Sequence, residues 1–227
     1  MKTVALLSQK GGAGKTTLAV CMAVAAERAG QSAIVLDLDP QATACNWSDR
    51  RENDMPVITD VQPARLNAAL SRAEQEGVDI AFLDTPPRSE HAALEAAKAA
   101  DLVVLPVRPQ IYDLETLKAT RELITMAGDT PALVLLNAVP ARGNRGRQAE
   151  DAVRAIDLPV AEASFGHRAA YGDAAALGLT PVEFESSGKA SQEMLHVYMY
   201  ISKLLDNATL PRGDYGETEA ESGKRTS

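Results

Sequence analysis

The chain has few cysteines, few aromatic residues and no long apolar run. Of its 227 residues, two are cysteine and 4% are aromatic. Two lone cysteines, Cys21 and Cys45, do not build a disulfide framework and are typical of a reducing compartment. No run of about 18 apolar residues occurs, as a transmembrane helix would need. Met1-Lys2-Thr3 leads directly into an apolar segment, without the pattern of a signal peptide. We therefore expect a cytoplasmic protein without membrane contact.

Basic residues are outnumbered by acidic ones, with 23 Lys and Arg against 31 Asp and Glu and a formal net charge of −8. An acidic chain is not a general polyanion binder, so any contact with nucleic acid requires a local basic patch. The hydrophobic fraction of 45% is enough for one domain with a sizeable core, expected over residues 1–206. Residues 207–227 are polar and mixed in charge, which predicts a disordered tail.

Short apolar segments alternate with helical ones along the chain. Strands are expected at 3–8, 33–38, 56–59, 78–84, 102–107 and 132–138. Helices are expected at 16–29, 63–76, 89–99, 113–127, 145–156, 168–177 and 187–206. Gly30, Gly77 and Gly128 follow three of the helices, where a left-handed residue is favoured, and Ser89 and Asp113 occupy N-cap positions. The alternation predicts an α/β fold, a doubly wound and mostly parallel sheet with helices on both faces and its ligand at the carboxyl ends of the strands.

A glycine-rich loop lies between the first expected strand and the first expected helix. Its glycines let backbone N–H groups turn toward an anion, and the helix N-terminus favours negative charge. Lys15 adds a positive charge for β and γ phosphates, and the Thr16 hydroxyl can complete the coordination of Mg²⁺. The pattern is that of a phosphate-binding loop. The candidate nucleotide-binding residues here are Lys10, Gly11, Gly12, Ala13, Gly14, Lys15, Thr16 and Thr17.

The loop departs from G-x-x-x-x-G-K-[ST] because Gln9 occupies the first glycine position and Lys10 follows it. This form resembles the deviant Walker A motif of the ParA/MinD family of P-loop ATPases, and the resemblance covers nearly all of residues 1–206. It implies ATP and Mg²⁺ as cofactors and an ATP-bound homodimer. It also implies that Lys10 reaches the nucleotide of the partner subunit.

Three aspartates lie at the carboxyl ends of two of the expected strands. Asp37 and Asp39 alternate at the end of the second strand, so we expect them on the same side. One carboxylate could hold a water on Mg²⁺ and the other could orient the attacking water. The segment resembles the family's D-x-D-P-Q switch, which implies that Asp39 serves hydrolysis and leaves Asp37 as a metal candidate. Asp84, followed by Thr85-Pro86-Pro87, stands at the Walker B position, which holds Mg²⁺ through a water. The catalytic candidates are Lys10, Lys15 and Asp39, and the metal candidates are Thr16, Asp37 and Asp84.

Two further segments carry predictions that depend on the resemblance. Residues 105–114 resemble the stretch that lines the family's dimer face, although Asp113 is equally well interpreted as a helix N-cap. Asn137 ends the last expected strand, where the family contacts adenine, and an amide offers both a donor and an acceptor. A capping asparagine would have the same pattern.

Three arginines among glycines form a local basic loop in this acidic chain. Arg142, Arg145 and Arg147 make up the loop, and Arg168 and Lys189 are candidates to extend it. Such a cluster could bind DNA phosphates without sequence preference, while the alternative is a solvated loop. The resemblance supports the first interpretation, because the family's partition members bind duplex DNA as ATP dimers.

The C-terminal segments 168–173 and 188–193 resemble small plasmid-type ParA proteins. The predicted function is therefore an ATP-dependent DNA-segregation ATPase for plasmid or chromosome partition. Nucleoid association and a ParB-like, centromere-binding partner that stimulates slow hydrolysis are implied. A MinD-like membrane switch is one alternative, but it should end in a basic amphipathic helix, and residues 216–227 are polar. A biosynthetic or redox relative is another, although Cys21 and Cys45 do not fit an iron–sulfur cluster of the nitrogenase type.

Overall fold

A six-stranded parallel sheet forms the centre of the computed structural model, which describes residues 1–206. The predicted tail, 207–227, lies outside the described residues. The strands are β1 (Lys2–Leu6), β2 (Ala33–Asp37), β3 (Val57–Asp60), β4 (Ile80–Asp84), β5 (Leu102–Val107) and β6 (Ala132–Leu136). They lie in the order β3-β2-β4-β1-β5-β6, and every pair is parallel. The predicted fold class is confirmed, and each predicted strand is present within two residues at either end.

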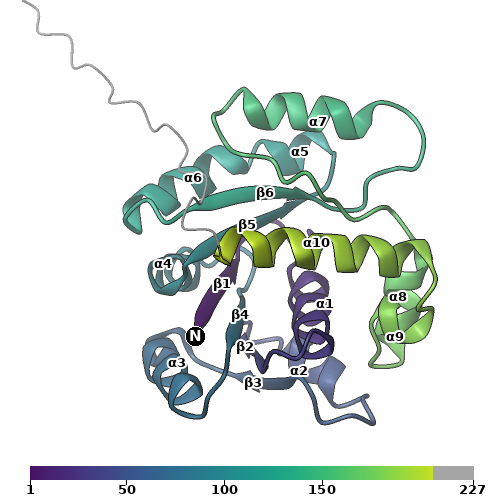
Figure 1. Cartoon of the computed structure of the whole chain (residues 1–227). Helices are drawn as coiled ribbons and strands as arrows, with labels where there is room; N and C mark the ends of the chain where they lie inside the picture. Colours follow the sequence, from purple (N-terminus) through teal and green to yellow (C-terminus); the bar gives the residue numbers. More distant parts are fainter. Residues whose placement is uncertain (207–227) are drawn as a thin grey trace, which may run out of the picture.

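Helices cover both faces of this sheet. They are α1 (Lys15–Arg28), α2 (Thr43–Ser48), α3 (Leu66–Gln75), α4 (Glu90–Ala99), α5 (Ile111–Leu114), α6 (Leu117–Met126), α7 (Arg145–Arg154), α8 (Ala169–Ala176), α9 (Pro181–Phe184) and α10 (Lys189–Asp206), with a 3₁₀ turn at Pro63–Arg65. In Figure 1, α3, α4 and α6 lie on one side of the sheet, and α1 and α10 lie on the other. Within residues 1–206, none of these helices combines the length and apolarity that crossing a bilayer requires.

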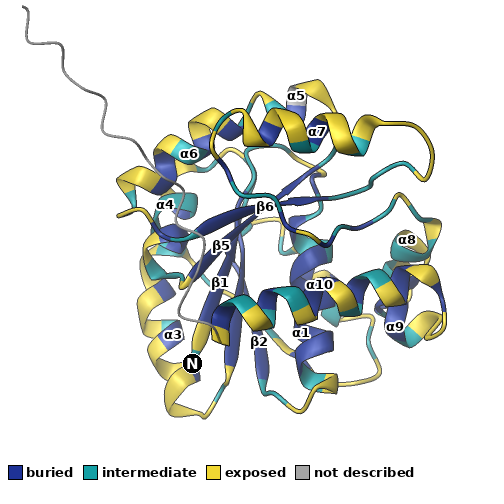
Figure 2. Cartoon of the chain, turned by 45° about the horizontal axis from the view of Figure 1, so that its top comes forward, coloured by how far each residue is buried: buried dark blue, intermediate teal, exposed yellow. Residues whose placement is uncertain are grey.

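The core is divided by the sheet into two apolar layers. Successive strand residues alternate between them, so Val4 and Leu6 pack toward α1 while Ala5 and Leu7 pack toward α3 and α4. Strands β1, β2, β5 and β6 appear as the buried centre of Figure 2, whereas the edge strand β3 is largely exposed. Helix α1 is buried from Leu18 to Ala26, and its alanines let it lie close to the sheet. Small aliphatic residues therefore do the packing that aromatic side chains do in other proteins.

The predicted helix boundaries need three corrections. The helix predicted at 113–127 is two helices, because the helical conformation is interrupted between Leu114 and Leu117. Asp113 is not an N-cap: it lies inside α5 with a 3% exposed side chain that pairs with cations. The short helices α2 and α9 were not predicted. By contrast, Ser89 accepts a hydrogen bond from the Ala92 amide as predicted for an N-cap, and the predicted left-handed glycines all have φ between 83° and 104°.

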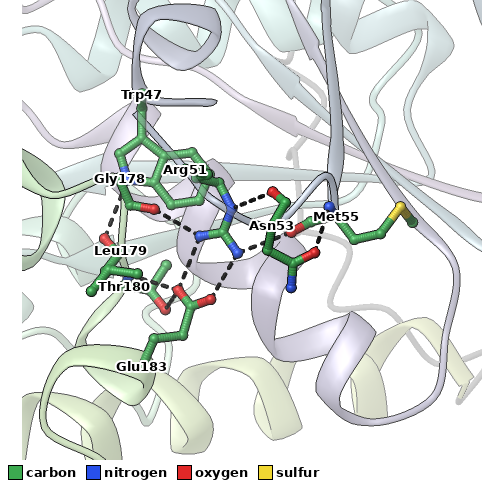
Figure 3. A network of polar contacts seen from close by, with 8 residues as sticks. All are labelled: Trp47, Arg51, Asn53, Met55, Gly178, Leu179, Thr180 and Glu183. Carbon is green, nitrogen blue, oxygen red and sulfur yellow. Dashed lines mark hydrogen bonds and ion pairs between the residues drawn. The ribbon is translucent and has the colours of Figure 1, made fainter. Parts of the chain in front are cut away.

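A buried arginine joins the segment after β2 to the C-terminal third of the chain (Figure 3). The Arg51 side chain is 2% exposed, stacks 4.5 Å from the centre of the Trp47 ring and pairs with Glu183 at 2.7 Å. Its guanidinium also donates to the carbonyl oxygens of Asn53, Met55 and Gly178. Trp47 donates to the carbonyl of Leu179. These contacts hold α2 and the residues that follow it against residues 178–183.

Candidate nucleotide site

The predicted phosphate loop, Gln9–Thr17, leaves the carboxyl end of β1 in the middle of the sheet. Leu6 of β1 and Asp37 of β2 are both register partners of Asp84 on β4. The loop and the two aspartates therefore meet at one edge of the sheet. Gly12 and Gly14 have φ of 72° and 98°, a conformation that favours glycine. The site is where the topology predicts it.

Lys15 opens α1 and is held inside the site. The residue is 7% exposed, and its Nζ donates to the carbonyl of Ser8 at 3.4 Å. Burial lowers the pKa of the Lys15 ammonium, while the nearby carboxylates of Asp84 and Asp39 act in the opposite direction. The carboxylates offset only part of the cost of burying the Lys15 ammonium, and an anion in the loop would restore more of what burial removes.

Thr16 and Asp84 form the shortest contact of the site. Thr16 Oγ1 donates to Asp84 Oδ2 at 2.6 Å. The other carboxylate oxygen, Oδ1, is buried and has no hydrogen-bond partner in the described part of the chain. Burial raises the pKa of Asp84 to about 7. An unsatisfied buried carboxylate oxygen beside a hydroxyl fits a hydrated divalent cation, which supplies both charge and hydrogen-bond donors.

Asp37 and Asp39 have different surroundings, although they are two residues apart. Asp37 is 1% exposed, and its two oxygens accept from the backbone amides of Asp39, Ala44 and Cys45 at 2.9 to 3.3 Å. It therefore holds the start of α2, and a metal at Asp37 would compete with these amides. Asp39 is half-buried at the rim, accepts from the Gln41 amide and lies within electrostatic range of Lys15.

Lys10 lies outside the phosphate loop's centre, next to a carboxylate from another element. Its Nζ is 3.9 Å from Asp113 Oδ1. Arg108, which follows β5, donates to the same carboxylate from Nε at 2.8 Å and from Nη2 at 3.4 Å. A Cβ built on Gly12 would lie 3.8 Å from Arg108 Nη1. The sequence interpretation missed Arg108, and the available signal was a basic residue at the carboxyl end of a strand.

Asn137 follows the carboxyl end of β6, at the same edge of the sheet, and supports the loop. Its Nδ2 donates to the carbonyl of Ala13 at 2.7 Å, and its Oδ1 accepts from the amide of Ala138. A Cβ on Gly14 would lie 2.0 Å from Nδ2, so only glycine fits beside this amide. The contact with adenine stays a prediction, because the side chain already has a loop-positioning role.

The predicted DNA-binding residues fall into two groups. Arg142, Arg145 and Arg147 are exposed on the loop before α7 and on its first turn, and Lys189 is exposed at the start of α10. Arg168 is different: it forms an ion pair with both carboxylate oxygens of Glu193. This pairing satisfies Arg168 within the chain, which weakens its candidacy for phosphate contact.

A parallel sheet with a strand–glycine loop–helix unit, a buried lysine and a carboxylate beside the Thr16 hydroxyl defines a P-loop nucleotide-binding protein. The chain belongs to the CobQ/CobB/MinD/ParA nucleotide binding domain family, which it matches over residues 4–182. This agrees with the resemblance found in the loop.

Relatives and solved structures extend this comparison. The chain is 33% identical over 209 residues to maintenance of carboxysome distribution protein A of Gloeobacter kilaueensis, covering 90% of this chain and 94% of the relative. It is 33% identical over 168 residues to the chromosome-partitioning ATPase Soj of Thermus thermophilus, and the match covers 60% of this chain and 67% of the relative. The septum site-determining protein MinD from Pyrococcus horikoshii, complexed with Mg-ADP, superposes with a TM-score of 0.75 at 18% identity, covering 89% and 96%. At that identity the structural likeness shows the fold alone.

Proposed function

We propose that this protein is an ATP-dependent DNA-segregation ATPase that alternates between a monomer and an ATP-bound homodimer. In this proposal the dimer binds duplex DNA without sequence preference, and slow hydrolysis, stimulated by a ParB-like partner protein, returns it to the monomer. The similarity to a chromosome-partitioning ATPase and to a distribution protein supports a switch whose output is a conformational state.

The site supplies the groups that this cycle needs. Lys15 and the loop amides would bind the phosphates of ATP. The Thr16 hydroxyl and the free oxygen of Asp84 would hold Mg²⁺, which supplies charge neutralisation of the phosphates when bound. Asp39, at the rim and half-buried, would orient the attacking water. Asn137 would position the loop, and adenine contact by its remaining amide hydrogen stays part of the proposal.

The observation that carries the dimer is the position of Lys10. Its ammonium is held toward Asp113 of α5, and Ile111 of the same helix is 68% exposed. Ile111 begins α5, the helix that carries Asp113, so an exposed apolar side chain and the carboxylate that holds Lys10 lie on one short element. A second copy of the chain would cover Ile111 and offer Lys10 a γ-phosphate.

Light scattering and a DNA pull-down test the proposal together. With ATP and Mg²⁺ the mass should double and DNA should be retained, and with ADP or without nucleotide neither should occur. Lys15→Ala should abolish nucleotide binding, and Lys10→Ala should bind nucleotide as a monomer but not dimerise. Equal mass in ATP and ADP would contradict the switch.

A second candidate function shares the switch but not the cargo. The similarity to a protein named for carboxysome distribution favours a role in positioning a cargo other than DNA. In that case the DNA-bound dimer would be the surface along which the cargo is distributed. Identification of the proteins retained specifically by the ATP-bound dimer separates the two. A MinD-like membrane role or a biosynthetic role would instead require vesicle binding or a small-molecule product.

A further inference from the structure

One carboxylate beside the nucleotide site is shared by two cations. Asp113 is 3% exposed and lies 3.9 Å from the Lys10 ammonium. Arg108 contacts both oxygens of the same carboxylate, and its side chain is 30% exposed. The hydrogen-bonded ion pair between Arg108 and Asp113 at 2.8 Å is stronger than the contact between Lys10 and Asp113 at 3.9 Å. Coulomb attraction falls with distance, and the planar guanidinium group matches the geometry of a carboxylate.

The presence of two cations on Asp113 affects the energy needed to move Lys10 from Asp113 to a phosphate. If Lys10 were the only cation on Asp113, its departure to a phosphate would leave a buried carboxylate without a counter-ion. Such an uncompensated charge is strongly unfavourable. Arg108 removes that penalty, since it keeps Asp113 paired whether or not Lys10 is present. The energy needed to release Lys10 is therefore set by Arg108.

We propose that Arg108 is the positioning residue that makes Lys10 available for ATP-driven dimerisation, by serving as the permanent counter-ion of Asp113. Arg108 does not act on the phosphates in this role; it acts through Asp113. The inference rests on the proposed function, because it presupposes that Lys10 leaves Asp113 when the ATP dimer forms. It adds a device that sets the ATP concentration at which the switch operates.

The test uses the full chain and compares the parent with its variants by light scattering across an ATP titration and by binding of ADP to the monomer. Arg108→Gln should raise the ATP concentration for half-maximal dimerisation at least about fivefold, the low end of typical coupling between sites. Its affinity for ADP should not change. Adding Asp113→Asn to Arg108→Gln should bring the ATP concentration for half-maximal dimerisation back to the parent's value or below it, since no carboxylate remains to hold Lys10. Arg121→Gln is the matched control, because Arg121 has a similarly exposed side chain (27%) that faces Asp157 outside the site.

The outcomes separate this inference from the proposed function. A parent that does not dimerise with ATP, or a Lys10→Ala variant that dimerises like the parent, overturns both. If those two controls behave as proposed but Arg108→Gln dimerises like the parent, the counter-ion role alone is overturned. Loss of ADP affinity in Arg108→Gln without rescue by Asp113→Asn also overturns it, because Arg108 would then act on the phosphates directly. Should Arg108→Gln fail to fold, Asp113→Asn alone decides: it should dimerise at lower ATP concentrations than the parent, and weaker dimerisation contradicts the inference.

Discussion

Thr16 Oγ1 donates to Asp84 Oδ2 at 2.6 Å, a contact between residues 68 positions apart that joins the phosphate loop to the end of β4. The contact uses one carboxylate oxygen and leaves the other buried without a partner among the described residues. Burial then raises the pKa of Asp84 from 3.8 to about 7, even though the Thr16 hydrogen bond and the Lys15 charge oppose the shift. The nucleotide-free site therefore holds an unfavourable negative charge that a cation would relieve.

The first prediction concerns the pH dependence of Asp84. Because its pKa is raised in the folded state, its contribution to stability is fully present below pH 3.8 and is lost as the pH rises through about 7. Asp84→Asn should therefore stabilise the nucleotide-free protein at about pH 8, by about 1–3 kcal/mol, because it removes the buried negative charge while keeping a polar group at the same place. Thermal unfolding of parent and variant at pH values on either side of this pKa measures the difference.

The same pKa predicts a proton release. Mg²⁺ needs the ionised carboxylate, so binding of Mg²⁺-nucleotide should weaken as the pH falls below about 7, and binding below that pH should release protons. Calorimetry in buffers of different ionisation enthalpy measures the release. Asp84→Asn should abolish it, and an unchanged release in the variant would assign the proton to another group.

The second prediction separates nucleotide binding from hydrolysis. Asp39→Ala should bind ATP and dimerise, because the loop and Lys15 are intact, but its turnover should fall by a factor on the order of 10²–10⁴, as expected when a general acid–base group is removed. Single-turnover phosphate release measures the effect. Asp37→Ala is the contrasting variant: it frees the amides of Ala44 and Cys45, so it should lower the melting temperature as well. Normal turnover in Asp39→Ala would move the hydrolytic role elsewhere.

The sequence predicts those parts of the site that depend on local order. The loop and Asn137 each follow a strand and Asp84 ends one, and the carboxyl ends of parallel strands share one edge, so their meeting could be foreseen. Asp113 could not be placed, because its cations come from the ends of other elements and its position at a helix start resembles a cap. Helix α2 was missed for a similar reason: it has no side-chain cap of its own, and Asp37 from β2 holds its first turn.

The third prediction tests the buried Arg51–Glu183 pair. Burial would raise the pKa of Glu183, but hydrogen bonds from Arg51 and Thr180 outweigh it and lower the pKa below its ordinary 4.5. The stability from this pair is present above pH 4.5 and is lost as the pH falls through the lowered pKa. Arg51→Ala should destabilise the protein at about pH 7 by about 3 kcal/mol, because Glu183 loses its cation and keeps only the hydrogen bonds from Thr180.

Exposed arginines provide the comparison for that destabilisation. Arg65→Ala, which removes an exposed guanidinium, should change stability by about 0.5 kcal/mol or less. Urea unfolding at neutral pH and at a pH below the ordinary pKa of glutamate measures both variants, and the deficit of Arg51→Ala should shrink at the lower pH. A deficit that is small at neutral pH, or independent of pH, would mean that Arg51 acts through packing on Trp47 and not through Glu183.

The last prediction concerns DNA and the arginines on the loop before α7 and on the first turn of α7. Arg142, Arg145 and Arg147 are exposed, and an acidic chain keeps a single copy of this patch weak on DNA at physiological salt. In an ATP-bound dimer two copies would act together, and affinity would rise through effective concentration without any additional interaction. Replacing the three arginines by alanine should therefore reduce DNA binding of the dimer. The slope of log affinity against log salt should become shallower by about 0.9 for each DNA phosphate that the variant no longer neutralises.

The control for this variant must remove the same charge from another place. Arg28, Arg65 and Arg72 are exposed, lie outside the loop before α7, and can be replaced by alanine together. Both triple variants change the net charge equally, so a general electrostatic effect would weaken DNA binding in both. A specific patch predicts weaker binding only for the Arg142–Arg147 variant, with ATP-driven dimerisation intact in each. Gel shifts with ATP at several salt concentrations distinguish these outcomes, and equal binding by the two variants would return the three arginines to an ordinary solvated loop.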